Sequence, residues 1–147
     1  MKPENSTILV TGGSAGLGAT VATAIVEMGG AVVIADLNEA AGKRLVSELG
    51  ERAVFVKCNV ADFVGVGVAL DAAERQTRPF RAVVNCAGIV DAAKVVGRSG
   101  PHPLDRFRKV IEVNLIGTFN VIRLAGIGIG VEFGNWRIEL GSEYFCC

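Results

Sequence analysis

Short apolar runs alternate along the chain with segments in which apolar residues recur at helical spacing, at a period of about 25 residues. Four runs have the continuous apolar composition of buried strands and occupy residues 7–10, 31–36, 53–58 and 81–85. Helical patterns follow the first three runs, at residues 17–28, between Asn38 (the expected N-cap) and Gly50, and at residues 63–76. Strands that alternate with helices predict a parallel sheet with right-handed crossovers, so the expected fold class is α/β, doubly wound.

The fourth run is followed by a loop, residues 86–103, and then by a longer helical pattern that begins near Leu104. One face of this helix carries Phe107, Ile111, Asn114, Leu115 and Thr118. After Ala125 the sequence reads GIGIG, and these glycines should end the helix, because each costs about 1 kcal/mol relative to Ala. Alternating residues on either side of Gly134-Asn135 then predict a short β-hairpin or edge strand that packs Trp136. We therefore divide the chain into residues 1–125 and a divergent tail, residues 126–147.

Composition narrows the class of protein. The 147 residues suffice for one domain with a buried core. Lys+Arg and Asp+Glu both number 15, so no charge excess indicates a nucleic-acid partner or a membrane surface. Half of the residues are apolar and the mean hydropathy is +0.44. That high value indicates a parallel sheet that is buried on both faces. It also indicates a chain that lacks part of the structure that would bury its apolar residues.

Membrane, targeting and metal signals are weak. No uninterrupted run of about 18 apolar residues is present, so a transmembrane helix is not predicted. The first residues, MKPENSTILV, have neither a signal-peptide nor a presequence pattern. The four cysteines lack metal-ligand spacing, so we expect neither a metal site nor a disulfide framework.

The segment TGGSAGLG, residues 11–18, follows a predicted strand and opens a predicted helix. In that context Gly12 can form the tight turn, Gly16 lets the backbone approach a pyrophosphate, and Gly18 lets the helix pack close to the sheet. A glycine-rich turn without a ligand is the alternative interpretation.

Asp36 ends the second strand, 18 residues after Gly18. A carboxylate there can accept hydrogen bonds from the hydroxyls of an adenosine ribose and would repel a 2′-phosphate. Neither Leu37 nor Ala15 offers a cation for that phosphate, so NAD is favoured over NADP. A solvated acid that caps a helix is the alternative.

Together these residues resemble the short-chain dehydrogenases/reductases. The first motif has their TGxxxGxG spacing, and NCAG, residues 85–88, is similar to their NNAG, with Cys86 in place of the second Asn. VNLIGTFNV, residues 113–121, resembles the long interface helix of the family, where Asn114 matches the active-site asparagine. The resemblance runs from about Thr7 to Ala125 and implies half of such an enzyme, a partial Rossmann-like sheet of about four strands with flanking helices.

The resemblance implies that residues 1–125 are an NAD-binding half. Its cofactor-binding residues would be Gly12, Ser14, Gly16, Leu17 and Gly18 at the pyrophosphate and nicotinamide side, Asp36 with Leu37 at the adenosine ribose, Asn59 and Val60 at the adenine ring, and Cys86, Ala87 and Gly88 at the adenosine end. Ser14-Ala15 reverses the order usual in this subgroup, which is expected to weaken phosphate binding. Asn85 is expected to pair strand and loop backbone.

The family's reaction uses a tyrosine acid/base, a lysine four residues later, a serine from the preceding strand and the asparagine. The lysine lowers the tyrosine pKa, which is about 10 when unperturbed. Tyr144 does not fit, because its lysine would be residue 148 and the sequence ends at Cys147. Ser142 is too near to belong to a separate strand. We therefore expect Asn114 to be the one catalytic residue retained and the chain alone to be inactive.

The substrate class implied by the resemblance is 3-hydroxyacyl-CoA or hydroxysteroid alcohols. A non-catalytic chain that binds NAD weakly, or that associates with full-length subunits, is a second hypothesis. A Rossmann-like methyltransferase is a third, against which NCAG and VNLIGTF argue. The resemblance also implies a homo-oligomer and a mitochondrial location, with the cytoplasm as the alternative. The fourth strand, or whichever strand borders the missing half, is expected to form an open apolar edge.

Overall fold

The computed structural model describes residues 2–98, 100–128 and 143–146. Its main sheet is parallel, with strands in the order β3-β2-β1-β4-β7. The strands are β1 (Thr7–Thr11), β2 (Ala31–Asp36), β3 (Ala53–Lys57), β4 (Phe80–Asn85) and β7 (Glu143–Cys146). The predicted α/β fold with a parallel sheet and the positions of the first four strands are confirmed.

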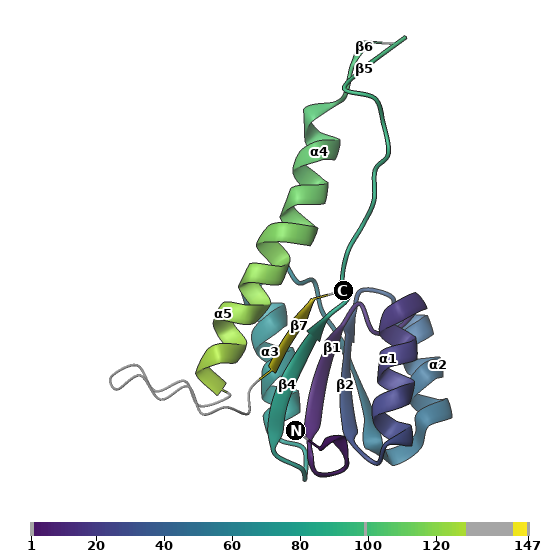
Figure 1. The fold of residues 1–147 in the computed structure, drawn as a ribbon, viewed down its shortest axis with the longest axis vertical. Coiled ribbons are helices and arrows are strands. Elements are labelled where there is room, and N and C mark those ends of the chain that lie inside the picture. The colour runs from purple at the N-terminus through teal and green to yellow at the C-terminus, as the bar shows by residue number, and fades with distance from the viewer. Residues whose placement is uncertain (1, 99, 129–142, 147) are drawn as a thin grey trace.

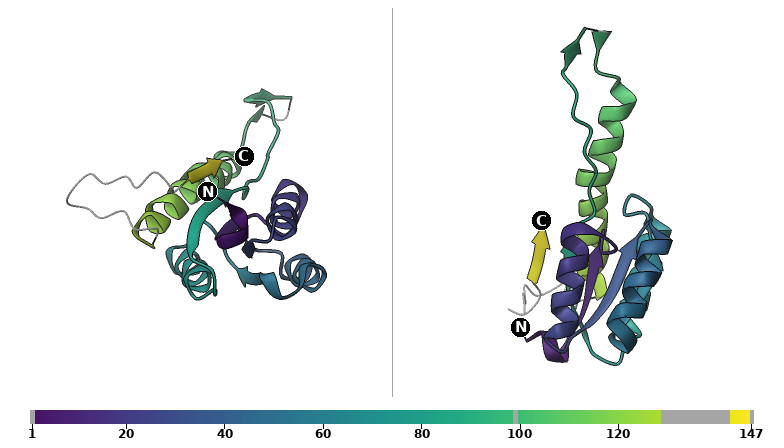
Figure 2. Two further views of the ribbon diagram at one scale, coloured as in Figure 1. Left: turned by 60° about the horizontal axis from the view of Figure 1, so that its bottom comes forward. Right: turned by 90° about the vertical axis from the view of Figure 1, so that its right-hand side faces the viewer.

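Helices cover both faces of the sheet (Figures 1 and 2). On one face lie α1 (Gly16–Glu27) and α2 (Glu39–Leu49), and on the other lie α3 (Phe63–Glu74) and α5 (Thr118–Gly128). Alternate residues of each central strand therefore enter different cores. Leu9 and Val33 pack with α3 and α5, whereas Val10 and Ile34 pack with α1. All four are fully buried, which explains the continuous apolar strands.

Side-chain caps start two of the helices. The amide N–H of Ala41 donates to Asn38 Oδ1 over 3.1 Å, so the predicted N-cap of α2 is confirmed. Asp62 caps α3 by accepting from the N–H groups of Val64 and Gly65. The 3-10 turns Pro3–Asn5 and Gly50–Arg52 lead into β1 and β3.

The long helix starts at Leu104, as predicted, and runs to Gly128, beyond the break expected after Ala125. It consists of α4 (Leu104–Ile111), a π-helical segment (Glu112–Gly117) and α5. The N-terminal part and residues 86–103 rise from one edge of the sheet as an arm, with the two-residue strands β5 (Val96–Gly97) and β6 (Gly100–Pro101) at its tip (Figure 1). A bidentate pair between Arg106 and Asp91 joins the two sides of this arm.

The last described part of the tail, residues 143–146, is the last strand at one edge of the described sheet. These residues form β7, which pairs in parallel with residues 82–85 of β4, so β4 itself is not the open edge, the first of the two alternatives that the sequence left. The connection from β4 through the long helix gives the tail strand the parallel direction of the rest of the sheet. The hairpin or edge strand predicted around Gly134-Asn135 and Trp136 lies outside the described residues.

One helix of the described chain, Leu104–Ile127, is long and apolar enough to cross a membrane by length and composition. The sequence prediction differed because it counted uninterrupted apolar residues, and Glu112 and Arg123 interrupt this helix. A core helix of a soluble protein passes the same test. Val121 and Ala125 of α5 are fully buried in the core beneath the sheet, whereas 22% of the apolar window of this helix is buried in all.

Packing at two helical glycines gives a matched test of this fold. A Cβ at Gly42 of α2 would lie 2.1 Å from a ring carbon of Phe55, whereas a Cβ at Gly67 of α3 would meet nothing within 4 Å. Gly42→Ala should therefore lower the free energy of unfolding by about 1–3 kcal/mol, the cost of overpacking. Gly67→Ala should raise it by about 0.5–1 kcal/mol, because Ala is the better helix former. Urea unfolding curves measure both, and equal stability of the two variants would contradict this packing.

Candidate cofactor-binding site

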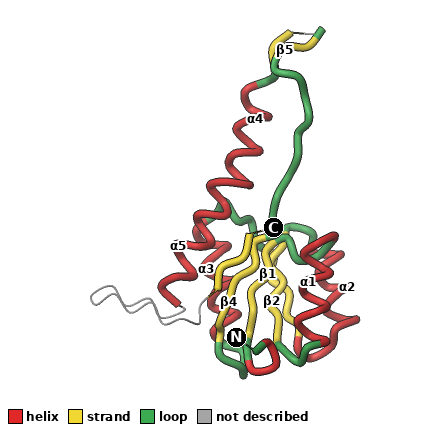
Figure 3. The backbone as a smooth tube through the Cα atoms, in the orientation of Figure 1, coloured by secondary structure: helices red, strands yellow, loops and turns green. Residues whose placement is uncertain are grey.

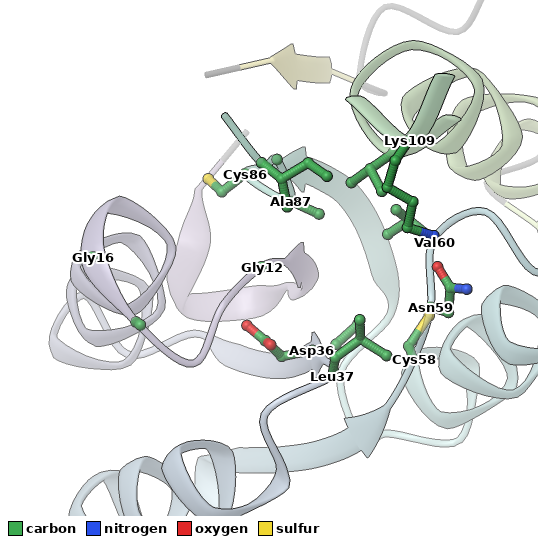
Figure 4. Close-up of a pocket in the computed structure, with 15 residues that line it drawn as sticks. Gly12, Gly16, Asp36, Leu37, Cys58, Asn59, Val60, Cys86, Ala87 and Lys109 are labelled. Atoms are coloured by element: carbon green, nitrogen blue, oxygen red, sulfur yellow. The ribbon is translucent and has the colours of Figure 1, made fainter. Parts of the chain in front are cut away.

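The carboxyl ends of β1 to β4 surround a cavity of about 430 Å³. The loops that follow these strands meet at this edge of the sheet (Figure 3). The chain crosses from β1 to β2 on one side and returns to β4 on the other, so the cavity lies at the point where strand order reverses. The lining residues are Gly12, Ala15, Gly16, Ala35, Asp36, Leu37, Cys58, Asn59, Val60, Cys86, Ala87, Gly88, Ile89, Lys109 and Val113 (Figure 4).

The glycine turn after β1 combines tight packing with one open position. A Cβ at Gly12 would lie 2.6 Å from the Ala87 nitrogen, and one at Gly18 would lie 2.2 Å from the Gly12 oxygen. At Gly16 a Cβ would meet nothing within 4 Å, although its φ of 53° favours glycine. Ala15, the N-cap of α1, has no side chain that could cap the helix. The turn therefore presents open backbone and the positive end of a 12-residue helix to the cavity, as an anion site requires.

Asp36 reaches across the turn from the end of β2. Its Oδ2 accepts from the Ser14 N–H over 3.0 Å, and its Oδ1 accepts from the Asn38 N–H over 2.9 Å. Burial by itself raises the pKa of this carboxyl, but the hydrogen bonds from Asn38, Ser14 and Leu37 outweigh it and hold the pKa below the ordinary 3.8. The carboxylate is therefore ionised at neutral pH, and each oxygen keeps a lone pair that could accept from a ribose hydroxyl.

The hydroxyl of Ser14 is buried and makes no hydrogen bond of ordinary geometry. It lies close enough to Asp36 to add to the lowering of that residue's pKa. A buried hydroxyl without a full partner, in a turn with an open glycine, fits a site completed by a polar ligand. These features together fit the pyrophosphate and ribose of a dinucleotide.

The loop after β4 is held against β1 through Thr11. Its Oγ1 donates to Asn85 Oδ1 and accepts from the Ala87 N–H, both over 3.3 Å. Asn85 was expected to pair backbone groups, and that prediction is wrong: its oxygen bonds the Thr11 side chain, and its Nδ2 is buried without a hydrogen bond. The sequence could not show this because the two strands are far apart in the chain and become neighbours only in the sheet.

Asn114, the predicted relay residue, lies in the π-helical segment and does not line the cavity. Its side chain accepts from the Ile89 N–H and donates to the Ile89 carbonyl, each over 2.9 Å. The Thr118 hydroxyl donates to the Asn114 carbonyl over 2.8 Å. The amide therefore positions Ile89, which does line the cavity, and the catalytic role of Asn114 stays a prediction.

Most of the predicted cofactor residues come together in the structure. Those that line the cavity are Gly12, Gly16, Asp36, Leu37, Asn59, Val60, Cys86, Ala87 and Gly88. Ser14, Leu17 and Gly18 do not line it, although Gly18 supports Gly12 and Ser14 bonds Asp36. Asn59 uses its Oδ1 to accept from the Ala61 N–H over 3.1 Å, which leaves its Nδ2 for a ligand.

Sequence reasoning missed other lining residues. Ala35 and Cys58 directly precede predicted site residues at strand ends, so the strand pattern could have identified them. Lys109 and Val113 come from the long helix, and no local motif marks them. Burial, with smaller effects of Asp62 and Asp36, raises the pKa of the Cys58 thiol to about 11, so it stays protonated at neutral pH. Among the described residues, no group of three or more His, Cys, Asp or Glu could hold a metal ion.

Comparison with known proteins identifies the family to which the parallel sheet and the glycine turn belong. Residues 6–126 match the profile of the short chain dehydrogenases. This chain belongs to the short chain dehydrogenase family. That assignment decides against the methyltransferase hypothesis, because the matched region contains the entire cavity.

Similar proteins carry dehydrogenase names. The chain is 39% identical to 3-hydroxyacyl-CoA dehydrogenase type-2 of Drosophila melanogaster over 90% of its length, and 40% identical to the Bos taurus protein of that name over 92%. It is 32% identical to 3-beta-hydroxysteroid dehydrogenase of Comamonas testosteroni over 95%. It covers 52%, 51% and 53% of these relatives, respectively, so it spans about half of their length.

Two solved structures share the fold. The crystal structure of 3-hydroxyacyl-CoA dehydrogenase type-2 from Mycobacterium avium superposes with a TM-score of 0.80 and 39% identity, over 86% of this chain and 50% of the other. A 3-ketoacyl-(acyl-carrier-protein) reductase from Brucella melitensis, solved in complex with NADH, superposes with a TM-score of 0.77 and 26% identity, over 86% of this chain and 51% of the other.

The ionisation of Asp36 predicts how stability depends on pH. Because the folded pKa is depressed, the carboxylate contributes stability above the unfolded value of 3.8, and this contribution is lost as pH falls through the lower folded pKa. Asp36→Asn should therefore be less stable than the wild type at pH 7, and the difference should shrink as the solution is acidified below 3.8. Thermal unfolding followed by circular dichroism between pH 7 and pH 3 measures the difference.

The control is Asp71→Asn, because Asp71 is exposed and its Arg75 partner lies at 3.8 Å. It should change stability little at any pH. A difference for Asp36→Asn that is constant across the pH range would contradict the assigned role of the carboxylate.

Proposed function

We propose that this chain binds NAD(H) in the cavity at the carboxyl ends of β1 to β4, as the cofactor-binding half of a 3-hydroxyacyl-CoA or hydroxysteroid dehydrogenase. The observation that carries the proposal is the ionised Asp36 carboxylate beside the open Gly16 position and the uncapped start of α1. The names of the similar proteins and the NADH complex of one structural neighbour support it. A mitochondrial location is part of the proposal by resemblance, with the cytoplasm as the alternative.

In this proposal the pyrophosphate binds the N-terminus of α1 and the glycine turn, and the adenosine ribose binds Asp36. The adenine ring then lies toward Asn59 and Val60. Lys109 is the sole lysine or arginine among the residues that line the cavity. Its side chain lies beside Val60 and Asn59 rather than beside Asp36 (Figure 4). A 2′-phosphate at the ribose would therefore face the Asp36 carboxylate with no cation of the lining to neutralise it, which favours NAD over NADP.

Titration of the full chain with NADH and NADPH, followed by nicotinamide fluorescence, tests the cofactor and its preference. We expect NADH to bind more tightly than NADPH by about tenfold or more, because like charges a few ångströms apart repel by more than 1 kcal/mol. Asp36→Ala should bring the two affinities together. Glu39→Gln, which changes a neighbouring acid outside the cavity, should keep the wild-type preference. Equal wild-type affinities for NADH and NADPH would refute the assigned role of Asp36.

Bound NADH would supply the hydride, and the reaction then needs a group that gives a proton to the carbonyl oxygen of the substrate. In the family this is a tyrosine whose pKa a lysine four residues later lowers. Residues 1–147 contain one tyrosine, Tyr144, and residues 145–147 include no lysine. Its backbone lies in β7, opposite Val83 of β4. We therefore propose that the chain binds the cofactor and does not transfer hydride without residues from elsewhere.

Assay of the purified chain with acetoacetyl-CoA and NADH tests this second step. We expect no rate above the background oxidation of NADH, while a full-length 3-hydroxyacyl-CoA dehydrogenase type-2 in the same assay turns over. Tyr144→Phe should change nothing. A substantial rate that Tyr144→Phe abolishes would show that this tyrosine acts as the acid, against our proposal.

A non-catalytic role is the second candidate. Apolar side chains of the long helix are exposed, and they include Leu115, Phe119 and Ile127 at 62%, 63% and 68% of their surface. Exposed apolar side chains on one helix favour association with another protein. In this alternative the chain binds NAD weakly or associates with full-length subunits.

A further inference from the structure

We infer that Asn120 is a positioning residue for the adenine side of the cavity, acting through Val60. This inference rests on the proposed binding of NAD(H). Residues 58–62, which we name the adenine-side turn, follow β3 and provide Cys58, Asn59 and Val60 to the lining. Asn120 belongs to α5 and does not line the cavity itself.

Most of the hydrogen bonds described for the adenine-side turn lie within the turn or join it to β2 and to the start of α3. The Cys58 N–H donates to the Asp36 carbonyl over 3.0 Å, the Ala61 N–H to Asn59 Oδ1, and the Asp62 N–H to the Asn59 carbonyl. These bonds shape the turn but do not attach it to α5, the helix behind it. Among the described hydrogen bonds, that attachment is made by Asn120 Nδ2, which donates to the Val60 carbonyl over 2.8 Å.

This bond is well sheltered, because Val60 and Asn120 are 6% and 5% exposed. Without the Asn120 donor, the Val60 carbonyl would lack its partner in a place that water does not readily reach. The turn would then be expected to move toward solvent, and the Val60 side chain would move with it.

Arg123 holds the Asn120 amide in the productive orientation. Its Nη2 donates to Asn120 Oδ1 over 2.7 Å, so the amide oxygen is occupied and the amide nitrogen faces Val60. A flipped amide would bring two oxygens together at Val60 and two donors together at Arg123. The Arg123 guanidinium also lies 5.5 Å from the ring centroid of Phe63, the first residue of α3. The same three side chains therefore join α5 to the start of the helix that follows the turn.

Gly117 supports Val60 from the same helix by close packing. A Cβ at Gly117 would lie 2.5 Å from Val60 Cγ2 and 3.2 Å from its Cβ. Because a valine side chain is stiff at χ1, the residue as a whole would have to shift. The backbone of Val60 is thus held by Asn120 and its side chain by Gly117, and both contacts come from one helix.

The consequence is a link between α5 and nucleotide affinity. Loss of the Asn120 donor should weaken binding of ligands that contain the adenine base and leave the phosphate end untouched. A residue with a merely structural role would weaken every ligand alike or weaken none.

The test uses the full chain with AMP, NADH and ribose 5-phosphate, and NMR or calorimetric titration gives each dissociation constant. Asn120→Leu should weaken AMP and NADH by about five- to tenfold, as expected for one lost buried hydrogen bond, and should change ribose 5-phosphate by less than about twofold. Asn120→Asp keeps the side-chain size and the acceptor for Arg123 but loses the donor, so it should show the same pattern. It also serves if the leucine variant does not fold.

Gln76→Met is the matched control, because Gln76 Nε2 also donates to a backbone carbonyl, that of Ala72 over 3.1 Å, away from the cavity. It should leave all three affinities unchanged. Gly117→Ala should weaken AMP by about fivefold although Ala favours the helix, since the added methyl displaces Val60. An unchanged AMP affinity in both Asn120 variants, or an equal loss for ribose 5-phosphate, overturns the inference while the wild type still binds NADH. Failure of the wild type to bind NADH and AMP overturns the proposed function, and the inference falls with it.

Discussion

The close contact between Gly12 and Ala87 is the constraint on which the site depends. The two backbones approach until a single added Cβ would lie 2.6 Å from the Ala87 nitrogen. Thr11, one residue earlier, bonds the Ala87 amide and the Asn85 side chain. The ends of β1 and β4 are therefore joined at the point where strand order reverses, and the loops that diverge from this point enclose the cavity. A larger residue at position 12 would separate the two walls.

A second set of contacts gives this cavity its charge. The Asp36 carboxylate is held by backbone N–H groups from both sides, Ser14 of the glycine turn and Asn38 of the start of α2. These donors keep it ionised and fix its direction, so its contribution to specificity is set before any ligand arrives. The uncapped start of α1 lies in the same turn and has the opposite partial charge. A dinucleotide suits that separation of charge, because its ribose hydroxyls can donate to the carboxylate and its phosphates can bind the positive start of the helix.

The long helix supplies the remaining wall of the cavity through Lys109 and Val113. Val113 and Val121 are eight residues apart, a spacing that keeps both on one side of a helix, and both pack on the core beneath the sheet. The π-helical segment Glu112–Gly117 contains Val113 and leads into α5. It also brings Asn114 against Ile89 and Gly117 against Val60. A local irregularity in one helix thereby positions two separate parts of the lining.

Much of the fold was determined by the sequence itself, because buried parallel strands are continuous apolar runs and their helices begin at recognisable residues. Asn38 as an N-cap, the glycine turn and the acid that ends β2 are all local signals, and local signals suffice when the chemistry lies within a few residues. Only the tertiary structure decided that Thr11 bonds Asn85, that Lys109 and Val113 line the cavity, and that Asn120 bonds the turn at Val60. Each of these joins residues from different elements, and no pattern within one element carries information about which neighbour it meets. The strand β7 is another such case, because it pairs with a strand that is distant in the sequence. Its four residues form a parallel strand because the carboxyl half of β4 has backbone groups on that side that β1 does not pair.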